Sequence, residues 1–256
     1  MSRVAVITGG AGGLGQAFAR ALRDEAAGWT IVLVDLPGAL AGLDEVPGVE
    51  RVACDLTDDA EVATACAGIV ARHPAIELVI HNAGVTQIGL FGDTTLASQR
   101  RVMEINYFGS VRVVAGLLGA VRAGKGTHLA ISSVAGFAPL YKRTAYAASK
   151  HALNGFFSSL APEEAEHGVR VIIAAPSFVA TNPGRLDAGE DGIGRPGAAA
   201  DGFDEMTPDR AARIILDGWR RGTPFIPVGR VARLGWWINR LSPRLYARLM
   251  MRNIRR

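Results

Sequence analysis

The 256-residue chain predicts a single-domain α/β fold, in which helices flank a doubly wound parallel sheet of about seven strands and a helical tail follows. Two observations predict this class. Short runs that are apolar throughout indicate strands buried on both faces, and the helix-length stretches between them require parallel pairing with right-handed crossovers. A chain of this length can bury one large core. We assign residues 1–229 to the main domain and residues 230–256 to the tail, as an extension of the same domain.

The expected strands follow one another at residues 4–8, 30–35, 49–55, 78–82, 127–133, 169–176 and 225–228. In a doubly wound sheet, ligands bind beyond the carboxyl ends of the strands, near the point where the strand order reverses. Most of these ends carry residues of a candidate site: the run Gly9 to Gly15, Asp35, Asp55, Asn82-Ala83-Gly84, Ser133 and Pro176. We therefore expect these strand ends to face one crevice.

Composition limits the class of protein. With 49% hydrophobic and 20% charged residues, the chain is too apolar for a disordered protein. Its cysteines, Cys54 and Cys66, are too few and too widely spaced for a disulfide framework, a redox C-x-x-C pair or a metal cluster, so we expect buried thiols and no metal. We find no leader peptide and no apolar run of the roughly 20 residues that span a bilayer, and we therefore expect a cytoplasmic protein.

The glycine-rich run starts at Thr8 and contains Gly9, Gly13, Leu14 and Gly15, between the first strand and the next helix. Residues without a Cβ let backbone N–H groups and the positive end of a helix approach a dinucleotide pyrophosphate. A tight turn that binds nothing is the alternative, and the strand-turn-helix context disfavours it. The run therefore predicts a dinucleotide site.

Acidic residues at the next strand ends extend this site. Asp35 follows the turn by about 20 residues, where a carboxylate can accept both ribose hydroxyls and repel a 2′-phosphate; a solvated strand-end aspartate is the alternative. No basic residue lies in the following Leu36-Pro37-Gly38, so we expect NAD rather than NADP. Asp55, followed by Leu56, can accept a hydrogen bond from the adenine amino group. Capping the helix expected at residues 58–70 is an equally good and compatible role for Asp55.

Tyr146 and Lys150 are four residues apart and share one face of a helix, which places an ammonium group near a phenol. A free phenol titrates at about pH 10, but a neighbouring cation favours the phenolate and lowers its pKa. Tyr146 can then exchange a proton with a substrate oxygen as general acid or base. Ser133, at the preceding strand end, can hold the same oxygen. The order and spacing disfavour an unrelated surface pair.

These motifs resemble the short-chain dehydrogenase/reductase family over nearly the whole chain to about Val228, and the resemblance implies a Rossmann-like fold. The matching residues are Thr8, Gly9, Gly13 and Gly15 for the family's TGxxxGxG, Asn82, Ala83 and Gly84 for its NNAG, and Asn106, Ser133, Tyr146 and Lys150 for its catalytic set. The resemblance implies that Asn106 supports a water-mediated proton relay and that Lys150 binds the nicotinamide ribose. It also implies that Pro176 and Thr181 approach the carboxamide, and that the protein is a homodimer or homotetramer.

Three positions depart from this pattern. Ser177 replaces the family's usual glycine, and its Cβ is expected to shift the nicotinamide loop slightly without blocking binding. His81 stands in place of an asparagine, and we interpret it as a packing residue rather than a base. Pro162 lies deep in the helix expected at residues 146–167, where proline costs about 3 kcal/mol. We predict a kink or an early end there, in the helix that the resemblance places in the family's dimer interface.

The chain after the sixth strand has three parts. Residues 181–203 are rich in Gly, Ala, Pro and Asp without an apolar period, which predicts a mobile loop at the substrate pocket. Thr207-Pro208-Asp209 supplies an N-cap, a first-turn proline and a first-turn acid for a helix to about Arg221. In the tail, apolar residues recur every three or four positions, and Ser242-Pro243 predicts a break between two short helices.

The tail is strongly basic. Ten arginines and no acidic residue follow Asp217, and since the whole chain carries +4, the part up to Asp217 carries −6. We favour a tail that packs over the substrate pocket or against a partner subunit over one that contacts a membrane surface. We expect no nucleic-acid binding, because the aromatic and basic residues follow a helical stripe rather than a stacking module.

Taken together, the motifs predict an oxidoreductase that transfers hydride between NAD and a secondary alcohol or ketone, with Tyr146 as general acid or base. We expect an apolar substrate, such as a lipid-like, steroid or aromatic molecule. One alternative is a non-catalytic protein that senses NAD(H), or acts as a scaffold, and recruits a partner through its tail; the intact Ser133, Tyr146 and Lys150 argue against it. A second alternative is a membrane-peripheral enzyme of the same family.

Overall fold

The computed structural model describes residues 3–25, 28–181, 192–194, 197 and 204–254. Its main sheet has seven strands in the order β3-β2-β1-β4-β6-β7-β9, and all neighbouring strands pair in parallel. The strands are β1 (Arg3–Thr8), β2 (Trp29–Asp35), β3 (Val49–Ala53), β4 (Leu78–His81), β6 (Thr127–Ile131), β7 (Arg170–Pro176) and β9 (Phe225–Val228). The predicted doubly wound parallel sheet is confirmed, although β3, β4 and β6 end one or two residues earlier than expected.

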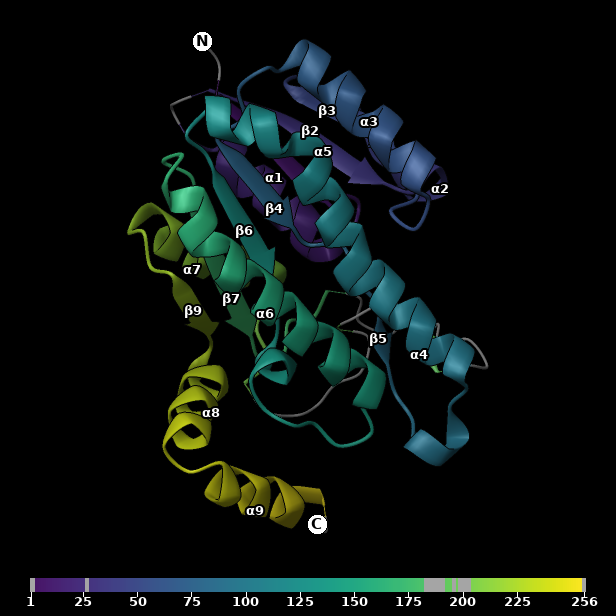
Figure 1. The fold of residues 1–256 in the computed structure, drawn as a ribbon, viewed down its shortest axis with the longest axis vertical. Helices are drawn as coiled ribbons and strands as arrows, with labels where there is room; N and C mark the ends of the chain where they lie inside the picture. The colour runs from purple at the N-terminus through teal and green to yellow at the C-terminus, as the bar shows by residue number, and fades with distance from the viewer. Residues whose placement is uncertain (1–2, 26–27, 182–191, 195–196, 198–203, 255–256) are drawn as a thin grey trace.

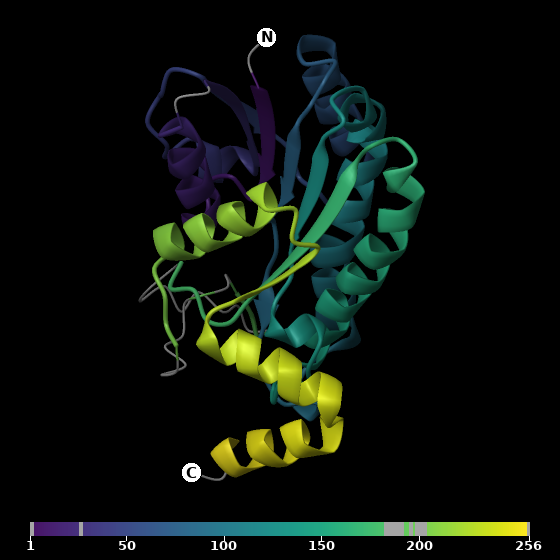
Figure 2. The same cartoon turned by 90° about the vertical axis from the view of Figure 1, so that its left-hand side faces the viewer.

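Helices cover both faces of this sheet (Figures 1 and 2). One face carries α1 (Gly13–Arg23) and α7 (Pro208–Arg220), and the other carries α3 (Asp59–Arg72), α5 (Gly109–Ala123) and α6 (Thr144–Ala165). Alternate residues along a strand point to opposite faces of the sheet and pack against different helix layers. In β1, Ala5 and Ile7 belong to the core under α1 and α7, whereas Val4 and Val6 belong to the core under α3 and α5. This double burial is why the strands are apolar throughout.

The remaining elements lie mostly beyond the carboxyl ends of the strands. They are α2 (Pro37–Leu40), β5 (Thr86–Gln87), η1 (Phe91–Asp93), α4 (Leu96–Met103), the π-helical turn η2 (Glu104–Phe108), η3 (Val134–Gly136), β8 (Ile193–Gly194), α8 (Arg230–Leu241) and α9 (Pro243–Ile254). Most of the loop predicted at 181–203 lies outside the described residues. Within that range the structure describes the two-residue strand β8, which pairs antiparallel with β5, and Ile193 is buried with Val102 and Ala145.

Two helix starts follow from local capping. Thr207 accepts the backbone N–H of Arg210 and precedes Pro208, so α7 begins where the sequence predicts. For α3, the capping residue is Asp58, whose carboxylate accepts the N–H groups of Ala60 and Glu61 at 2.8 and 2.9 Å. The capping role considered for Asp55 is therefore wrong. Asp58 directly precedes the first turn of α3, and its carboxylate already accepts the free backbone N–H groups of that turn.

The long helix α6 continues through Pro162 to Ala165, so the predicted early end is wrong. The residues after the proline are held by burial and by an ion pair. Glu164 is 1% exposed, and its carboxylate accepts two hydrogen bonds from the Arg122 guanidinium of α5, at 2.7 and 3.1 Å. Such a two-point contact with a buried carboxylate stabilises the last turn of α6 against the backbone cost of Pro162.

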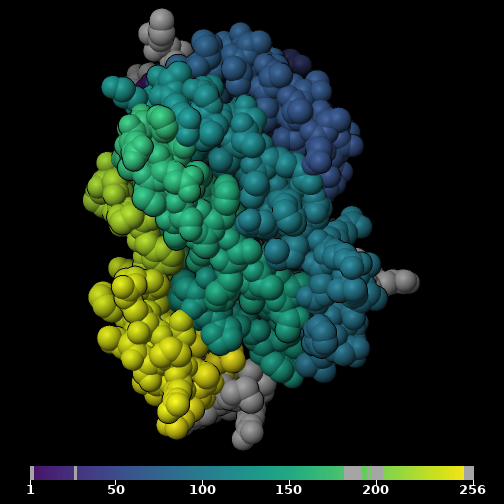
Figure 3. Space-filling model, viewed as in Figure 1, coloured from purple at the N-terminus to yellow at the C-terminus, as the bar shows by residue number. Residues whose placement is uncertain are grey.

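The tail forms two helices that break at Ser242, as predicted. α8 follows β9 directly, and α9 lies beyond it at the lower end of the molecule in Figures 1 and 2. In the space-filling view, the tail forms the yellow surface at the lower left (Figure 3). Within the described part of the chain, no helix combines the length and the apolar character needed to cross a membrane.

Candidate active site

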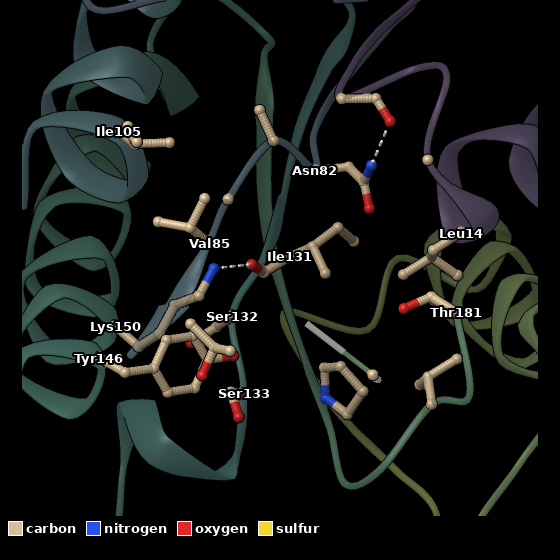
Figure 4. A pocket seen from close by; sticks show the side chains of 18 of the residues that line it. Leu14, Asn82, Val85, Ile105, Ile131, Ser132, Ser133, Tyr146, Lys150 and Thr181 are labelled. Carbon is tan, nitrogen blue, oxygen red and sulfur yellow. Dashed lines mark hydrogen bonds between the residues drawn. The ribbon is translucent and has the colours of Figure 1, made fainter. Parts of the chain in front are cut away.

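A cavity of about 1710 Å³ opens at the carboxyl ends of the strands. Its walls extend from the glycine-rich turn, past Asp35 and Asp55, to Tyr146 and Lys150. Figure 4 shows Leu14 and Thr181 on one side of this space and Tyr146 and Lys150 on the other. Pockets for a single drug-sized ligand measure about 300–1,000 Å³, so this cavity has room for a dinucleotide and a second molecule.

Nearly all of the site residues expected from the sequence lie in these walls. They are Gly9, Gly13, Leu14, Asp35, Asp55, Leu56, Asn82, Ala83, Gly84, Ser133, Tyr146, Lys150, Pro176 and Thr181. Two expected residues, Gly15 and Asn106, do not line the cavity. Both act behind its wall, through contacts described below.

In the glycine-rich turn, a side chain at several of the glycine positions would collide with neighbouring backbone atoms. Gly9 has a φ of +62°, in the left-handed region that favours glycine. A Cβ on Gly13 would lie 2.6 Å from the carbonyl oxygen of Thr181, and a Cβ on Gly15 would overlap the carbonyl oxygen of Gly9. Small residues here bring the start of α1, with its free N–H groups, next to the cavity.

The end of β4 holds this turn in place. The Asn82 amide donates to the carbonyl oxygens of Thr8 at 3.1 Å and Gly9 at 3.0 Å, and Figure 4 marks one of these two hydrogen bonds. In return, the Thr8 hydroxyl accepts the backbone N–H groups of Asn82 and Ala83. Two segments more than 70 residues apart in the sequence are thereby joined at the floor of the cavity.

Asp35 and Asp55 lie in the wall that the sequence assigns to the adenosine half of a dinucleotide. One carboxylate oxygen of Asp35 accepts the Ala11 N–H at 2.9 Å and the other accepts the Leu36 N–H at 2.8 Å. Since a carboxylate has about four acceptor sites, Asp35 keeps acceptor capacity for a ligand. Asp55 accepts the backbone N–H and the hydroxyl of Thr57, which fixes its orientation.

Ser133, Tyr146 and Lys150 come together at the other end of the cavity (Figure 4). The Tyr146 hydroxyl is hydrogen-bonded to the Ser133 hydroxyl. The Lys150 ammonium lies 5.9 Å from the centre of the Tyr146 ring and donates to the Ile131 carbonyl oxygen at 2.9 Å. Ser133 follows β6, whereas Tyr146 and Lys150 lie on one face of α6, so packing of this helix against the sheet assembles the group.

The electrostatics of this group differ from the sequence-based expectation. Although part of its ring is open to the cavity, burial raises the pKa of Tyr146 above its usual value of 10.0, and the Ser133 hydrogen bond and the charge of Arg143 oppose that rise only in part. Burial also lowers the pKa of Lys150 to about 8. The expected net lowering of the phenol pKa is therefore wrong for this structure, because desolvation of the phenolate outweighs the Ser133 hydrogen bond and the charge of Arg143.

Asn106 lies in the π-helical turn η2 and is fully buried. Its amide donates to the Val85 carbonyl oxygen and the Ser149 hydroxyl, both at 2.9 Å, and its carbonyl oxygen accepts the Val85 N–H at 2.8 Å. A Cβ on Gly84 would lie 3.1 Å from that carbonyl oxygen and 3.6 Å from Lys150 Nζ. Asn106 thus joins the segment after β4 to α6 directly behind the Tyr146–Lys150 pair.

Two further polar residues line the cavity near Tyr146, and the sequence reasoning missed both. Arg143 lies three residues before Tyr146, and its positive charge favours the phenolate. Its guanidinium donates to the hydroxyl of Thr86 in β5. The three-residue spacing between Arg143 and Tyr146 could have predicted their proximity, since residues three apart lie on one side of a helix. Nothing in the sequence near Tyr146 predicts the approach of Thr86, which depends on the tertiary fold.

The two other positions singled out in the sequence have structural partners. The Ser177 hydroxyl donates to Asp204 at 3.2 Å, and the same carboxylate oxygen accepts the Val231 N–H in the first turn of α8. Ser177 therefore connects the segment after β7 to the tail. His81 is 1% exposed, lies 3.0 Å from the His128 ring nitrogen and packs against Phe157, which confirms its interpretation as a packing residue.

The tail contributes apolar walls to the same cavity, which agrees with the expectation that it packs over the substrate pocket. The contributing residues are Val231, Leu234, Gly235, Ile238, Tyr246, Leu249 and Met250. They come from both α8 and α9. The cavity is thus polar at the glycine-rich turn and more apolar at the tail.

Comparison with known proteins places this geometry in a family. The family model described as short chain dehydrogenase matches residues 3–187. A Bos taurus protein described as "Dehydrogenase/reductase SDR family member 7B" is 33% identical over 273 residues, which cover 99% of this chain and 82% of that protein.

Solved structures agree with this assignment. A short-chain dehydrogenase from Streptomyces avermitilis is 26% identical, with a TM-score of 0.81 over 100% of this chain and 98% of its own. A short chain dehydrogenase from Burkholderia cenocepacia, solved in complex with NADP, has the same fold, with a TM-score of 0.82 at 24% identity over 97% of this chain and 98% of its own. The chain therefore belongs to the short-chain dehydrogenase/reductase family.

Proposed function

We propose that this protein is an NAD-dependent oxidoreductase that interconverts a secondary alcohol and a ketone, and that its substrate is apolar. One observation carries the proposal. A single cavity is bordered by the glycine-rich turn and Asp35 at one end and by Ser133, Tyr146 and Lys150 at the other. When bound, the dinucleotide supplies the hydride. The residues of this chain supply its binding groups and the proton.

The proton chemistry assigns a role to each residue of the catalytic group. The raised pKa of Tyr146 keeps the phenol protonated at neutral pH, so Tyr146 can donate a proton to a ketone oxygen as general acid. Ser133 holds the same oxygen through its hydroxyl. Lys150 orients the ribose and, when charged, favours the phenolate. Asn106 supports a water-mediated proton relay from Lys150, a role that rests on the family resemblance.

The protonation state of the Tyr146 phenol makes the reaction direction depend on pH. Ketone reduction needs the protonated Tyr146, whereas alcohol oxidation needs the phenolate, which forms only as the pH rises toward a pKa above 10.0. We therefore expect reduction to proceed at neutral pH and oxidation to increase steadily with pH in the alkaline range. Initial rates in both directions at a series of pH values measure this difference. Equal pH dependence in the two directions contradicts the assignment of Tyr146.

The main experiment follows nicotinamide absorbance with a panel of apolar ketones and secondary alcohols. Replacing Tyr146 by Phe removes only the hydroxyl, and kcat is expected to fall by about 10²–10⁴-fold. Fluorescence titration of NADH provides the control, since the affinity of the Tyr146→Phe variant should stay close to that of the wild type. Tight NADH binding without turnover of any panel member contradicts the proposal and favours a sensing or scaffolding protein.

NAD preference rests on Asp35. Its carboxylate lies at the glycine-rich turn, where it would repel a 2′-phosphate. The Burkholderia cenocepacia protein was solved with NADP, but at 24% identity its likeness to this chain concerns the fold alone, and the cofactor preference of this chain is tested directly. The ratio of kcat/KM for NADH to that for NADPH should exceed one and should fall at least about tenfold on Asp35→Ser, the effect expected for loss of a close charge contact. An unchanged ratio excludes Asp35 as the determinant.

The cytoplasmic location and the assembly into a homodimer or homotetramer stay predictions. Light scattering on the purified chain measures the assembly directly. A monomer at micromolar concentration contradicts it.

A further inference from the structure

The tail carries a set of exposed apolar side chains that the main domain does not cover. On α8 they are Val231, Leu234, Trp237 and Leu241, and on α9 they are Leu245 and Leu249. Leu234, Trp237 and Leu241 are 63%, 56% and 79% exposed. We call these six residues the tail patch. Their spacing of three or four residues within each helix places them on one face. Contiguous exposed apolar surface of this kind marks an interaction site.

Positive charge surrounds the tail patch. Arg230, Arg233, Arg240, Arg244 and Arg248 are all exposed, and residues 230–256 contain no acidic residue. Helices that lie in a membrane interface combine an apolar face with arginines or lysines on the adjoining face, and often carry tryptophan. Among the described helices, none can cross a bilayer, so the relevant arrangement is a helix lying along the surface.

The tail patch is also part of the rim of the cavity. Val231, Leu234 and Leu249 are exposed and line it at the same time. Ile88 and Tyr141 of the main domain also line the cavity, and they are 38% and 46% exposed. The segment from β5 to the first residue of α4 adds exposed Leu90, Phe91 and Leu96, and in Figure 1 this segment and α9 both lie at the lower end of the molecule. Exposed apolar residues of both the tail and the main domain therefore line the same cavity.

We propose that the tail patch and these exposed apolar residues of the main domain dock on an anionic lipid surface, with the cavity facing the lipid. Charge decides between lipid and a second copy of the chain. Two tail patches in contact would bring arginines of both copies together, with no acidic residue in either tail to pair with them. An anionic bilayer offers apolar and negative groups to the same face.

In the docked arrangement, the apolar walls of the cavity would adjoin the apolar interior of the bilayer. An apolar substrate dissolved in the bilayer would enter the cavity past Leu234 and Leu249 without crossing water. This consequence rests on the proposed function, whereas docking itself does not depend on turnover. The two can therefore fail separately.

The test is co-sedimentation of the full-length protein with vesicles of phosphatidylcholine, with and without phosphatidylglycerol. We expect binding to the anionic vesicles, weakened by raising NaCl from about 0.1 to about 0.5 M, which shortens the screening length. Trp237→Ser combined with Leu241→Ser removes exposed apolar surface outside the cavity walls and should weaken binding at least about tenfold. Phe108→Ser, which changes a 44% exposed side chain on η2, is the matched control and should bind as the wild type does.

The charge contribution has its own pair of variants. Arg244→Gln with Arg248→Gln should weaken partitioning about 25-fold, since each basic residue near an anionic surface contributes about fivefold. Arg23→Gln with Arg210→Gln changes exposed arginines on α1 and α7 and should have no effect. NADH binding and turnover, measured without vesicles, should be the same in all four variants.

Three results overturn the docking proposal. They are failure of the wild type to sediment with anionic vesicles, equal loss in the tail variants and their controls, and a tail-dependent dimer seen by light scattering in place of vesicle binding. The last result assigns the patch to a second copy of the chain. Vesicle binding by a protein without turnover leaves docking standing and contradicts only the proposed function.

Discussion

Gly13 shows how one residue couples the dinucleotide turn to the segment after β7. A Cβ at this position would lie 2.6 Å from the Thr181 carbonyl oxygen and 3.1 Å from its Cα, so the Gly13→Ala variant must displace backbone. We expect the free energy of unfolding to fall by about 1–3 kcal/mol, as for other overpacked sites. Affinity for NADH should fall about tenfold, because both sides of the cavity move apart. Urea unfolding and fluorescence titration measure the two effects.

Gly119→Ala is the control for that experiment. Gly119 lies on the exposed side of α5, and a Cβ there would meet nothing within 4 Å. Alanine in a helix is better than glycine by about 0.5–1 kcal/mol, so this variant should be more stable than the wild type and bind NADH unchanged. If Gly13→Ala behaves like Gly119→Ala, the contact with Thr181 has no energetic importance.

The catalytic group shows the limit of residue spacing as evidence. The spacing of Tyr146 and Lys150 predicts correctly that both line one cavity, yet it gives the wrong direction for the phenol pKa. Spacing describes which charges are near a group. It does not describe how much solvent the group loses, and at this site the desolvation is the larger effect.

At the scale of single elements, α6 shows how packing overrides a local preference. Pro162 removes a backbone donor and crowds the preceding turn, yet the helix continues to Ala165. The Pro162→Ala variant keeps the contact between Glu164 and Arg122 and restores the missing donor. We expect its free energy of unfolding to rise by about 1–3 kcal/mol, measured by urea denaturation.

Pro208→Ala is the matched control for Pro162→Ala. Pro208 is the first residue of α7, where the backbone N–H of any other residue would have no partner inside the helix. Removing it should bring no gain in stability. A similar gain in both variants would show that proline lowers stability here through something other than its position in the helix.

At the scale of the whole molecule, the buried pair of His81 and His128 links stability to pH. Burial lowers the pKa of His128 from its ordinary 6.5 to about 4, and it lowers the pKa of His81 well below 6.5. Each histidine therefore takes up a proton on unfolding at a pH where the folded protein keeps it neutral. Stability is complete above pH 6.5 and is lost as the pH falls toward 4. His128 alone accounts for a loss of about 3 kcal/mol.

Urea unfolding at a series of pH values between 7 and 4 measures this loss. The His128→Gln variant should lose less stability over the same range, while His151→Gln, on the exposed side of α6, should follow the wild type. Glu164 adds a separate loss at lower pH, because Arg122 holds its pKa below 4.5. Parallel curves for the wild type and His128→Gln would show that the pair does not control acid stability.

The fold and most of the site could be predicted from the sequence, because their signals are local. Apolar runs mark strands buried on both faces, Thr207-Pro208 marks a helix start, and Ser242-Pro243 marks the break in the tail. The glycine-rich turn and the strand-end residues follow from the topology that these runs predict, since parallel strands bring their carboxyl ends to one edge.

Only the tertiary structure decided what depends on burial and on contacts between distant segments. It assigned the α3 cap to Asp58 instead of Asp55, carried α6 past Pro162 through Arg122, and placed Arg143 beside Tyr146. It also placed the tail helices against the cavity and left six of their apolar residues exposed. The physical reason is the same in each case. Desolvation, ion pairing and exposed area depend on which segments meet in space, and a spacing of three or four residues along the chain does not contain that information.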